Sequence, residues 1–242
     1  MRGLNTCSDK ITGEHYVSHA ALRVLADEKI DVSGFPWLEG GSRIIGFARL
    51  TTKCLCAAHN NVLSPLDAVA GRFFAAIKEC GTDNVGLNKH FLFSGHDIER
   101  WLLKTLAGLD ASRSLASNKE RLRDSFHESI DVAALLENSA LWSRPVGLYL
   151  AGRKGQIIQR RDLFHFAPLT RLDDNKLAGI TTLLLGFHFT LLAMPPPARA
   201  PVEGATYRPS GIIFNYGRVK HLIEISWQDD LEHVKMIIAE DV

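Results

Sequence analysis

Residues 54–67 read Cys-Leu-Cys-Ala-Ala-His-Asn-Asn-Val-Leu-Ser-Pro-Leu-Asp, and they combine candidate metal ligands with the start of a helix. Cys56 and His59 are three residues apart, so a tight turn can bring a thiolate and an imidazole to one ion. Ser64 can cap the free amides of a helix, and Pro65 suits the first helical position. An acidic residue three positions after the serine completes a pattern like a capping box. We therefore predict a turn that presents ligands, followed by a helix that Ser64 caps and that begins at Pro65.

A second group of candidate ligands lies near the N-terminus, where Cys7 is followed by the dipeptide Glu14-His15. An acid–histidine dipeptide after a cysteine, with Cys-x-x-His-Asn-Asn and a helix further on, resembles the HNH nucleases with a ββα-metal fold. The resemblance covers about residues 4–80, and the nearest branch carries two Cys-x-x-Cys pairs. This sequence departs from that branch at Leu4 in place of a cysteine, Ser18 in place of a proline and His59 in place of a cysteine.

The resemblance implies a catalytic role for several of these residues. Glu14 would bind Mg²⁺ or a similar ion, His15 would be the general base, and Asn60 or Asn61 would be a second ligand or would orient the base. One histidine beside one divalent ion can activate water, neutralise the phosphate and stabilise the leaving oxygen. The implied substrate is DNA. His19 shares a helix face with His15, and we expect a half-buried surface histidine there, with an auxiliary ligand as the alternative.

A structural zinc site is the second implication. Cys7, Cys56 and His59 are the candidate ligands, with Cys54 as the possible fourth, and four such ligands suit a closed tetrahedral zinc. Cys54 and Cys56 can both reach one ion only if the strand bends into a turn at this point. The alternative is a degenerate site, in which the cysteines are small buried hydrophobic residues and no zinc binds. Cys80 is expected at the buried end of a helix.

The bulk composition is ordinary for a soluble protein and sets limits on the partners. The chain has 242 residues, of which 46% are hydrophobic and 23% are charged, and its formal net charge is +1. The chain as a whole does not have the basic charge that would indicate nucleic-acid binding. Contact with DNA would therefore depend on a local basic patch. Arg43, Arg49 and Lys53 are the nearest positive charges, and a solvated strand face is their alternative role.

The cysteine content and the first residues predict a cytoplasmic location. Four cysteines are too few for a disulfide scaffold, and the chain opens without a signal-peptide pattern. It begins inside the motif, as expected if an upstream segment is missing. Residues 178–194 are uncharged and mostly apolar, but their length is only the lower bound for a membrane-spanning helix. We predict buried strands there and no membrane association.

The whole chain is predicted to have an α+β fold in three parts. These are an HNH-like ββα-metal module at 1–80, a helical segment at 81–144 and a β-rich C-terminal domain at 145–242. Helices are expected at 18–27, 65–80, 96–108 and 115–137, and a small hairpin within 30–47. The C-terminal part is expected to hold a hairpin at 146–159, one or two strands at 180–193, an exposed connector at 195–201 and a hairpin at 212–227.

Three functional hypotheses remain open at this point. The first is a metal-dependent endonuclease that hydrolyses DNA phosphodiester bonds with His15 as the general base. The second is a non-catalytic zinc-knuckle scaffold or DNA-contacting protein with the same fold. The third is a globular protein without metal. The sequence does not indicate the oligomeric state, the substrate structure or any sequence preference.

Overall fold

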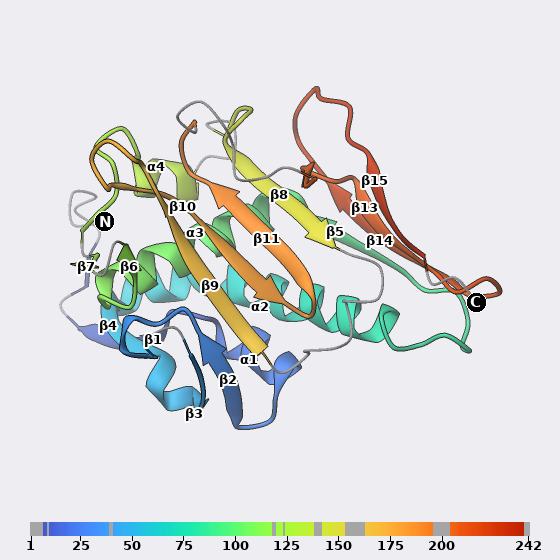
Figure 1. The fold of residues 1–242 in the computed structure, drawn as a ribbon, viewed down its shortest axis with the longest axis horizontal. Coiled ribbons are helices and arrows are strands. Elements are labelled where there is room, and N and C mark those ends of the chain that lie inside the picture. Colours follow the sequence, from blue (N-terminus) through green and yellow to red (C-terminus); the bar gives the residue numbers. More distant parts are fainter. Residues whose placement is uncertain are drawn as a thin grey trace.

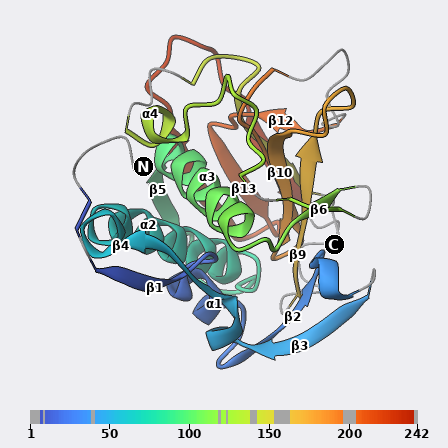
Figure 2. The ribbon, with the colours of Figure 1, turned by 90° about the vertical axis from the view of Figure 1, so that its left-hand side faces the viewer.

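A computed structural model gives the fold for residues 7–8, 10–38, 41–117, 120–122, 124–137, 142–152, 163–195 and 204–239. The protein has the predicted mixed α+β class (Figure 1). Two long helices, α2 (Ala57–Cys80) and α3 (Gly95–Ala111), run through the interior. They lie between a two-stranded sheet on one side and a large sheet on the other (Figure 2).

The two-stranded sheet joins the two motif segments. Strand β1 (Ile11–His15) pairs antiparallel with β4 (Thr51–Cys56), so that Ile11 lies opposite Cys56 and His15 lies opposite Thr51. Helix α2 follows β4 directly, which gives the order strand, strand, helix. Between the two strands the chain forms α1 (His19–Leu25), which packs against α2. This close packing needs Gly71, because a Cβ there would lie 2.8 Å from the Cβ of Ala20.

The large sheet has seven described strands in the order β12-β8-β11-β10-β9-β2-β3. Their bounds are Lys29–Ser33 for β2, Ser42–Gly46 for β3, Gly147–Gly152 for β8, Leu163–Thr170 for β9, Leu177–Leu184 for β10, Phe187–Leu192 for β11 and Thr206–Tyr207 for β12. The predicted small hairpin is therefore β2 and β3, and β2 pairs in parallel with β9. Leu185 and Gly186 both have positive φ, as two-residue hairpin turns of the mirror-image type require.

A four-stranded sheet contains the second predicted hairpin. Its order is β15-β13-β14-β5, with β13 at Gly211–Asn215, β14 at Lys220–Ser226, β15 at Lys235–Ala239 and β5 at His90–Ser94. The β13–β14 hairpin confirms the prediction for 212–227, whereas the parallel pairing of β5 with β14 is a long-range contact. Two short strands, β6 (Ala116–Ser117) and β7 (Glu120–Arg121), form a separate pair.

The core confirms the predicted apolar faces of the two long helices. On α2, Phe73 and Phe74 are completely buried, and both rings contact Phe189 of β11. On α3, the predicted inner stripe is buried as well, and it consists of Ile98, Trp101, Leu102 and Leu106. Cys80 is buried at the end of α2 with Gly81 after it, as expected.

The predicted start of α2 is wrong by two turns. The helix begins at Ala57, and Ser64 and Pro65 lie inside it. A proline within a helix leaves the carbonyl four residues earlier without its usual amide donor. Here that carbonyl belongs to Asn61, and the Ser64 hydroxyl donates to it at 2.9 Å. The Ser-Pro pair is thus tolerated inside the helix because the serine replaces the missing hydrogen bond.

The helix predicted at 115–137 is also wrong. Among the described residues of this range, only α4 (Val132–Glu137) is helical, and those before it form β6, β7 and irregular backbone. This backbone is fixed by tertiary contacts, because the buried Asp110 carboxylate accepts the Ser125 amide and Phe126 forms a bridge with Leu177. Two 3₁₀ turns, η2 (Pro36–Leu38) and η3 (Phe47–Leu50), flank β3.

The predicted three-part division does not coincide with breaks between sheets. Strands from 1–80 belong to the seven-stranded sheet, and β5 from 81–144 belongs to the four-stranded one. One continuous group of buried residues includes side chains from all three parts. The predicted strand at 156–159 and most of the connector, from 196 onward, lie outside the described residues. Residues 178–194 contain β10 and β11, and no helix in the described ranges has the length and apolarity to cross a membrane.

Candidate metal centre

Three of the predicted zinc ligands come together at the junction of β4 and α2. The thiol sulfurs of Cys7 and Cys56 and a ring nitrogen of His59 all lie within 4.8 Å of one another. His59 Nδ1 is 3.1 Å from the Cys56 sulfur and 3.7 Å from the Cys7 sulfur. Ligand atoms of a tetrahedral zinc stand about 3.5 Å apart, given the usual zinc–sulfur and zinc–nitrogen distances. The three side chains therefore fit one zinc ion with little movement.

Local structure explains why these atoms meet. Cys56 is the last residue of β4 and directly precedes α2. The first turn of this helix therefore places the His59 side chain near the Cys56 thiol. Ser8 fastens the N-terminal segment, because its amide donates to the Cys56 sulfur at 3.4 Å and its hydroxyl accepts from the Ala58 amide at 3.2 Å. The His59 amide at the helix N-terminus lowers the pKa of the Cys56 thiol to about 6, against the opposing effect of burial. A thiol with such a pKa is largely a thiolate at neutral pH, the form that binds metal.

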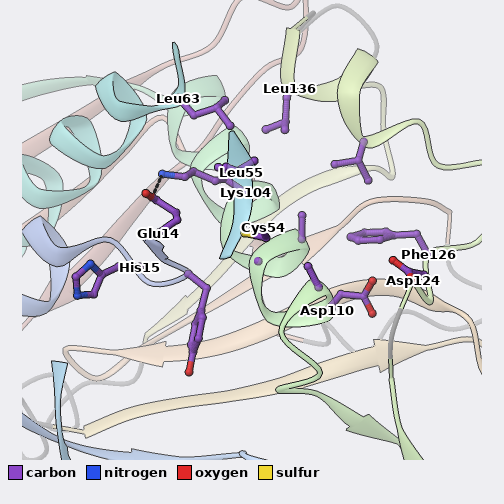
Figure 3. A pocket seen from close by; sticks show the side chains of 15 residues that line it. Glu14, His15, Cys54, Leu55, Leu63, Lys104, Asp110, Asp124, Phe126 and Leu136 are labelled. Atoms are coloured by element: carbon purple, nitrogen blue, oxygen red, sulfur yellow. Dashed lines mark hydrogen bonds and ion pairs between the residues drawn. The ribbon is translucent and has the colours of Figure 1, made fainter. Parts of the chain in front are cut away.

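The fourth predicted ligand, Cys54, lies outside this group. Its thiol borders a cavity on the side of β4 that faces Glu14 and Lys104 (Figure 3). Burial raises the pKa of this thiol, and the Glu14 carboxylate adds to the effect. Within the described residues, three ligand atoms therefore surround the possible zinc position. Leu4, the other position relevant to the motif, is outside the described residues.

Glu14, the implied ligand of a catalytic metal, is bound to a lysine. The ammonium of Lys104 on α3 lies 2.6 Å from a Glu14 oxygen (Figure 3). It also lies 2.5 Å from an oxygen of Asp67 on α2. Only 6% of the Lys104 side chain is exposed. Burial raises the pKa of Asp67, while the lysine opposes that change. The Lys104 ammonium would repel a divalent ion beside Glu14 and would compete with it for this carboxylate.

His15 lies at the other end of the β1–β4 pair from the cysteine–histidine group. It stands opposite Thr51, whereas Cys56 stands opposite Ile11, and four strand residues span about 13 Å. Its ring centroid is 5.3 Å from that of His19, and its imidazole points away from the Glu14–Lys104 pair (Figure 3). Burial, followed by the charge of His19, lowers the pKa of His15, which favours the neutral imidazole.

The two asparagines lie on α2, away from His15. The side-chain amide of Asn60 donates to the Thr12 hydroxyl at 3.3 Å, which links the helix to the first half of β1. Asn61 is exposed, and its backbone carbonyl accepts from Ser64. The structure therefore brings Cys7 together with Cys56 and His59, but it does not assemble Glu14, His15 and an asparagine around one ion.

Sequence reasoning missed Lys104 and the role of Asp67. Lys104 is the single charge within the apolar run Trp-Leu-Leu-Lys-Thr-Leu at 101–106, which is a signal that could have identified a buried, paired lysine. Asp67 was expected to complete a helix cap, and it instead binds this lysine.

Comparisons with models of protein families, with curated proteins and with solved structures found no match for this chain.

Proposed function

We propose that this protein is a zinc-binding scaffold whose strand–strand–helix unit is not catalytic. One zinc ion on Cys7, Cys56 and His59 would fasten the N-terminal segment to the start of α2. The observation that supports this proposal most directly is the meeting of three ligand atoms within 4.8 Å, although Cys7 and His59 are 52 residues apart. When bound, zinc supplies a cross-link between these segments, and its binding energy becomes folding energy.

The position of Lys104 supports the absence of catalysis. A metal-dependent hydrolase needs a divalent ion to stabilise the charge that develops on phosphate. Glu14 instead accepts a charged hydrogen bond from Lys104, and Asp67 accepts another. The lysine therefore supplies the positive charge that these two carboxylates need in a buried position.

Cobalt substitution tests the proposed zinc site in the full chain. Co²⁺ bound by two thiolates and an imidazole in tetrahedral geometry gives intense visible absorption and sulfur-to-metal charge-transfer bands. We expect these bands in the wild type and in Cys54→Ser, which changes a cysteine outside the group, and their loss in Cys56→Ser. Wild-type protein that is folded and gives no such bands would overturn the zinc proposal.

The second candidate is a DNA endonuclease with His15 as the general base. The order β1, β4, α2, with an acid–histidine pair at the end of the first strand, is the order expected of a ββα-metal module. The lowered pKa of His15 favours a neutral ring, which can accept a proton. Arg43, Arg49 and Lys53 are all exposed and available to phosphate.

Plasmid nicking in Mg²⁺, Mn²⁺ or chelator separates the two candidates. His15→Ala is compared with His188→Ala, a matched change at an exposed position on β11. The scaffold proposal predicts no metal-dependent nicking by the wild type or by either variant. Nicking that His15→Ala abolishes and His188→Ala retains would favour the nuclease. Equal nicking by all three proteins would indicate a contaminating enzyme and would not support the nuclease.

A further inference from the structure

Strand β5 leaves one side of the four-stranded sheet open. It is the last strand in the order β15-β13-β14-β5, and among the described strands it pairs only with β14. The Leu222 amide donates to the Lys89 carbonyl, and this parallel pattern turns the peptide groups of Phe91 and Phe93 toward β14. The amide and carbonyl of Leu92, which lies between them, therefore point away from the sheet. Such an edge can pair with a strand of another chain.

A groove of about 590 Å³ runs along this edge, where β5 lies beside helix α2 (Figure 2). Residues 91–94 form its strand side, and Asp97 of α3 also borders it. Its helix side consists of Val69, Arg72, Ala75, Ala76 and Glu79. Phe91 and Phe93 are only partly buried, although the Phe93 ring contacts Phe73 of α2. A strand added to β5 would lie in this groove and would cover both rings further.

The helix side of the groove carries a positive charge near one end and a negative charge near the other. Arg72 is exposed and forms no ion pair or hydrogen bond with a described residue. Glu79 shares the Lys89 ammonium with Asp83, so two carboxylates have one cation and the group stays negative. Arg72 and Glu79 are seven residues apart, so they lie on one helix face, about 10 Å apart along its axis. Their midpoint falls within the two alanines at 75–76.

This arrangement of charges is complementary to itself. In a second copy related by a twofold axis near residues 75–76, helix α2 would run antiparallel to the first. Arg72 of each copy would then lie opposite Glu79 of the other. The alanines at 75–76 would let the two helices approach each other at the axis. The remaining charge of the groove, Asp97, already pairs with Arg100. The groove therefore matches a second copy of this chain better than a peptide with charges of one sign.

We propose that two copies of the chain associate through this groove, with β5 antiparallel to β5 of the second copy. Leu92 would lie on the twofold axis and exchange main-chain hydrogen bonds with Leu92 of the second copy, while His90 would face Ser94. The two four-stranded sheets then form one continuous sheet, with the two α2 helices packed side by side against it. This association is distinct from zinc binding, because the groove and the metal centre share no described residue.

Sedimentation velocity of the full chain measures this association directly. We expect the wild type, with a chain mass of 26.8 kDa, to sediment as a dimer at micromolar concentration. Arg72→Glu and Glu79→Arg should each raise the dimer dissociation constant at least about tenfold, because either change creates two like-charge contacts. Arg121→Glu is the matched control on β7, which does not border the groove, and it should dimerise like the wild type. A monomeric wild type, or wild-type affinity in both groove variants, would overturn the proposal.

Mixing the two groove variants in equal amounts distinguishes this interface from any other. One chain then carries glutamate at both positions 72 and 79, and the other carries arginine at both, so each contact between the copies is attractive. We expect the mixture to form dimers again, with a dissociation constant close to that of the wild type. A mixture that associates as weakly as its two components would contradict the contact of Arg72 with Glu79.

Leu92→Lys tests the strand edge separately. The residue is 67% exposed, so the chain should fold with an unchanged circular dichroism spectrum. Lysine on an edge strand opposes pairing with another strand, and two ammonium groups would meet at the twofold axis. We therefore expect this variant to sediment as a monomer at concentrations where the wild type is a dimer. Unchanged dimerisation of Leu92→Lys would show that β5 does not form the interface.

Discussion

At the scale of single residues, Lys104 determines how Glu14 of the Glu14-His15 dipeptide can act. Its ammonium joins β1, α2 and α3 through Glu14 and Asp67. Such a buried ion pair contributes little net stability relative to an apolar replacement, but removing one partner leaves buried charge without compensation. Because of this asymmetry, the role of Lys104 can be tested by replacing it and measuring the stability of the protein.

Lys104→Met should lower the free energy of unfolding by about 3 kcal/mol, since the two carboxylates would remain without a counter-charge. The estimate is at the low end of the usual range because Glu14 and Asp67 keep 12% and 20% of their side chains exposed. Lys78→Met is the control, because Lys78 only donates to the Val24 carbonyl at the surface, and it should cost about 1 kcal/mol or less. Urea denaturation measures both, and equal losses would argue against the role of Lys104.

Asp83 should make stability depend on pH in the acid range. The Lys89 ammonium and the Gly86 amide both bind its carboxylate and hold the pKa of Asp83 below its usual value. The stabilisation is fully present above the unfolded pKa of about 3.9 and is lost as pH falls through the lower folded pKa. Asp83→Asn should therefore show a smaller fall in urea midpoint between pH 5 and pH 2 than the wild type. Identical falls in the two proteins would contradict this assignment.

At the scale of elements, the start of each helix shows how local and tertiary signals compete. Ser18 caps α1, since its hydroxyl oxygen accepts the Ala21 amide at 3.2 Å and the residue is buried. Ser64, which looked like a cap in the sequence, lies inside α2 and is exposed. A ligand-bearing turn was expected at Cys56–His59, and the helix instead begins there, because the pairing of β1 with β4 ends at Cys56.

The two serines should respond to different extents to removal of the hydroxyl. Ser18→Ala should destabilise the protein by about 1 kcal/mol, because a buried helix amide loses its cap. Ser64→Ala should change stability by only about 0.5 kcal/mol or less, because water can replace the hydroxyl at the carbonyl of the exposed Asn61 and alanine favours the helix interior more than serine. The pair forms its own control in a denaturation experiment. Equal losses of about 1 kcal/mol for the two variants would contradict this difference between a cap and a position inside a helix.

The sequence predicted those elements whose signals are local. The hairpins of β2 with β3 and of β13 with β14 were expected from their turns, and the buried faces of α2 and α3 from their periodicity. The parallel pairings of β2 with β9 and of β5 with β14 join distant segments, and no local pattern indicates them. The charged run before α4 looked helical because its tertiary contacts, such as that of Asp110 with Ser125, are invisible in a local window.

The same distinction applies to the candidate site. Cys56 and His59 were expected together from their spacing, and Cys7 was added to them by the family resemblance; the structure places the three together. The Lys104 contact depends on how α3 crosses β1 and α2, which the sequence does not specify locally. The cavity bordered by Cys54, Lys104 and Asp110 also depends on how α3 crosses these elements.

At the scale of the whole molecule, a buried network connects α3 with the strands of the C-terminal part. Arg208 donates to both oxygens of Glu99, at 2.8 Å and 3.1 Å, and to Asp229 at 2.5 Å. Glu99 also accepts the Leu148 amide of β8 at 2.8 Å. Gly147 is needed beside it, because it has φ +133 and its Cβ would lie 2.5 Å from a Glu99 oxygen. The network therefore links segments from two of the three parts expected from the sequence.

Arg208→Lys should destabilise the whole fold by about 3 kcal/mol or more, because lysine cannot reproduce the planar fork that binds Glu99. Because the core is continuous, unfolding monitored by tryptophan fluorescence and by far-ultraviolet circular dichroism should coincide in the wild type and in the variant. Arg171→Lys is the control, at an exposed turn where the arginine pairs with Asp173, and it should change the midpoint little. Separate transitions for the two probes would show that the parts unfold independently.

The metal content of the full chain, purified without added metal and measured by mass spectrometry, tests the zinc scaffold most directly. We expect one zinc per chain in the wild type and in Cys54→Ser, because Cys54 lies outside the ligand group. We expect almost none in Cys56→Ser or His59→Ala, because each removes a ligand. Correctly folded wild-type protein without zinc, or equal zinc in Cys56→Ser and the wild type, would contradict the zinc scaffold.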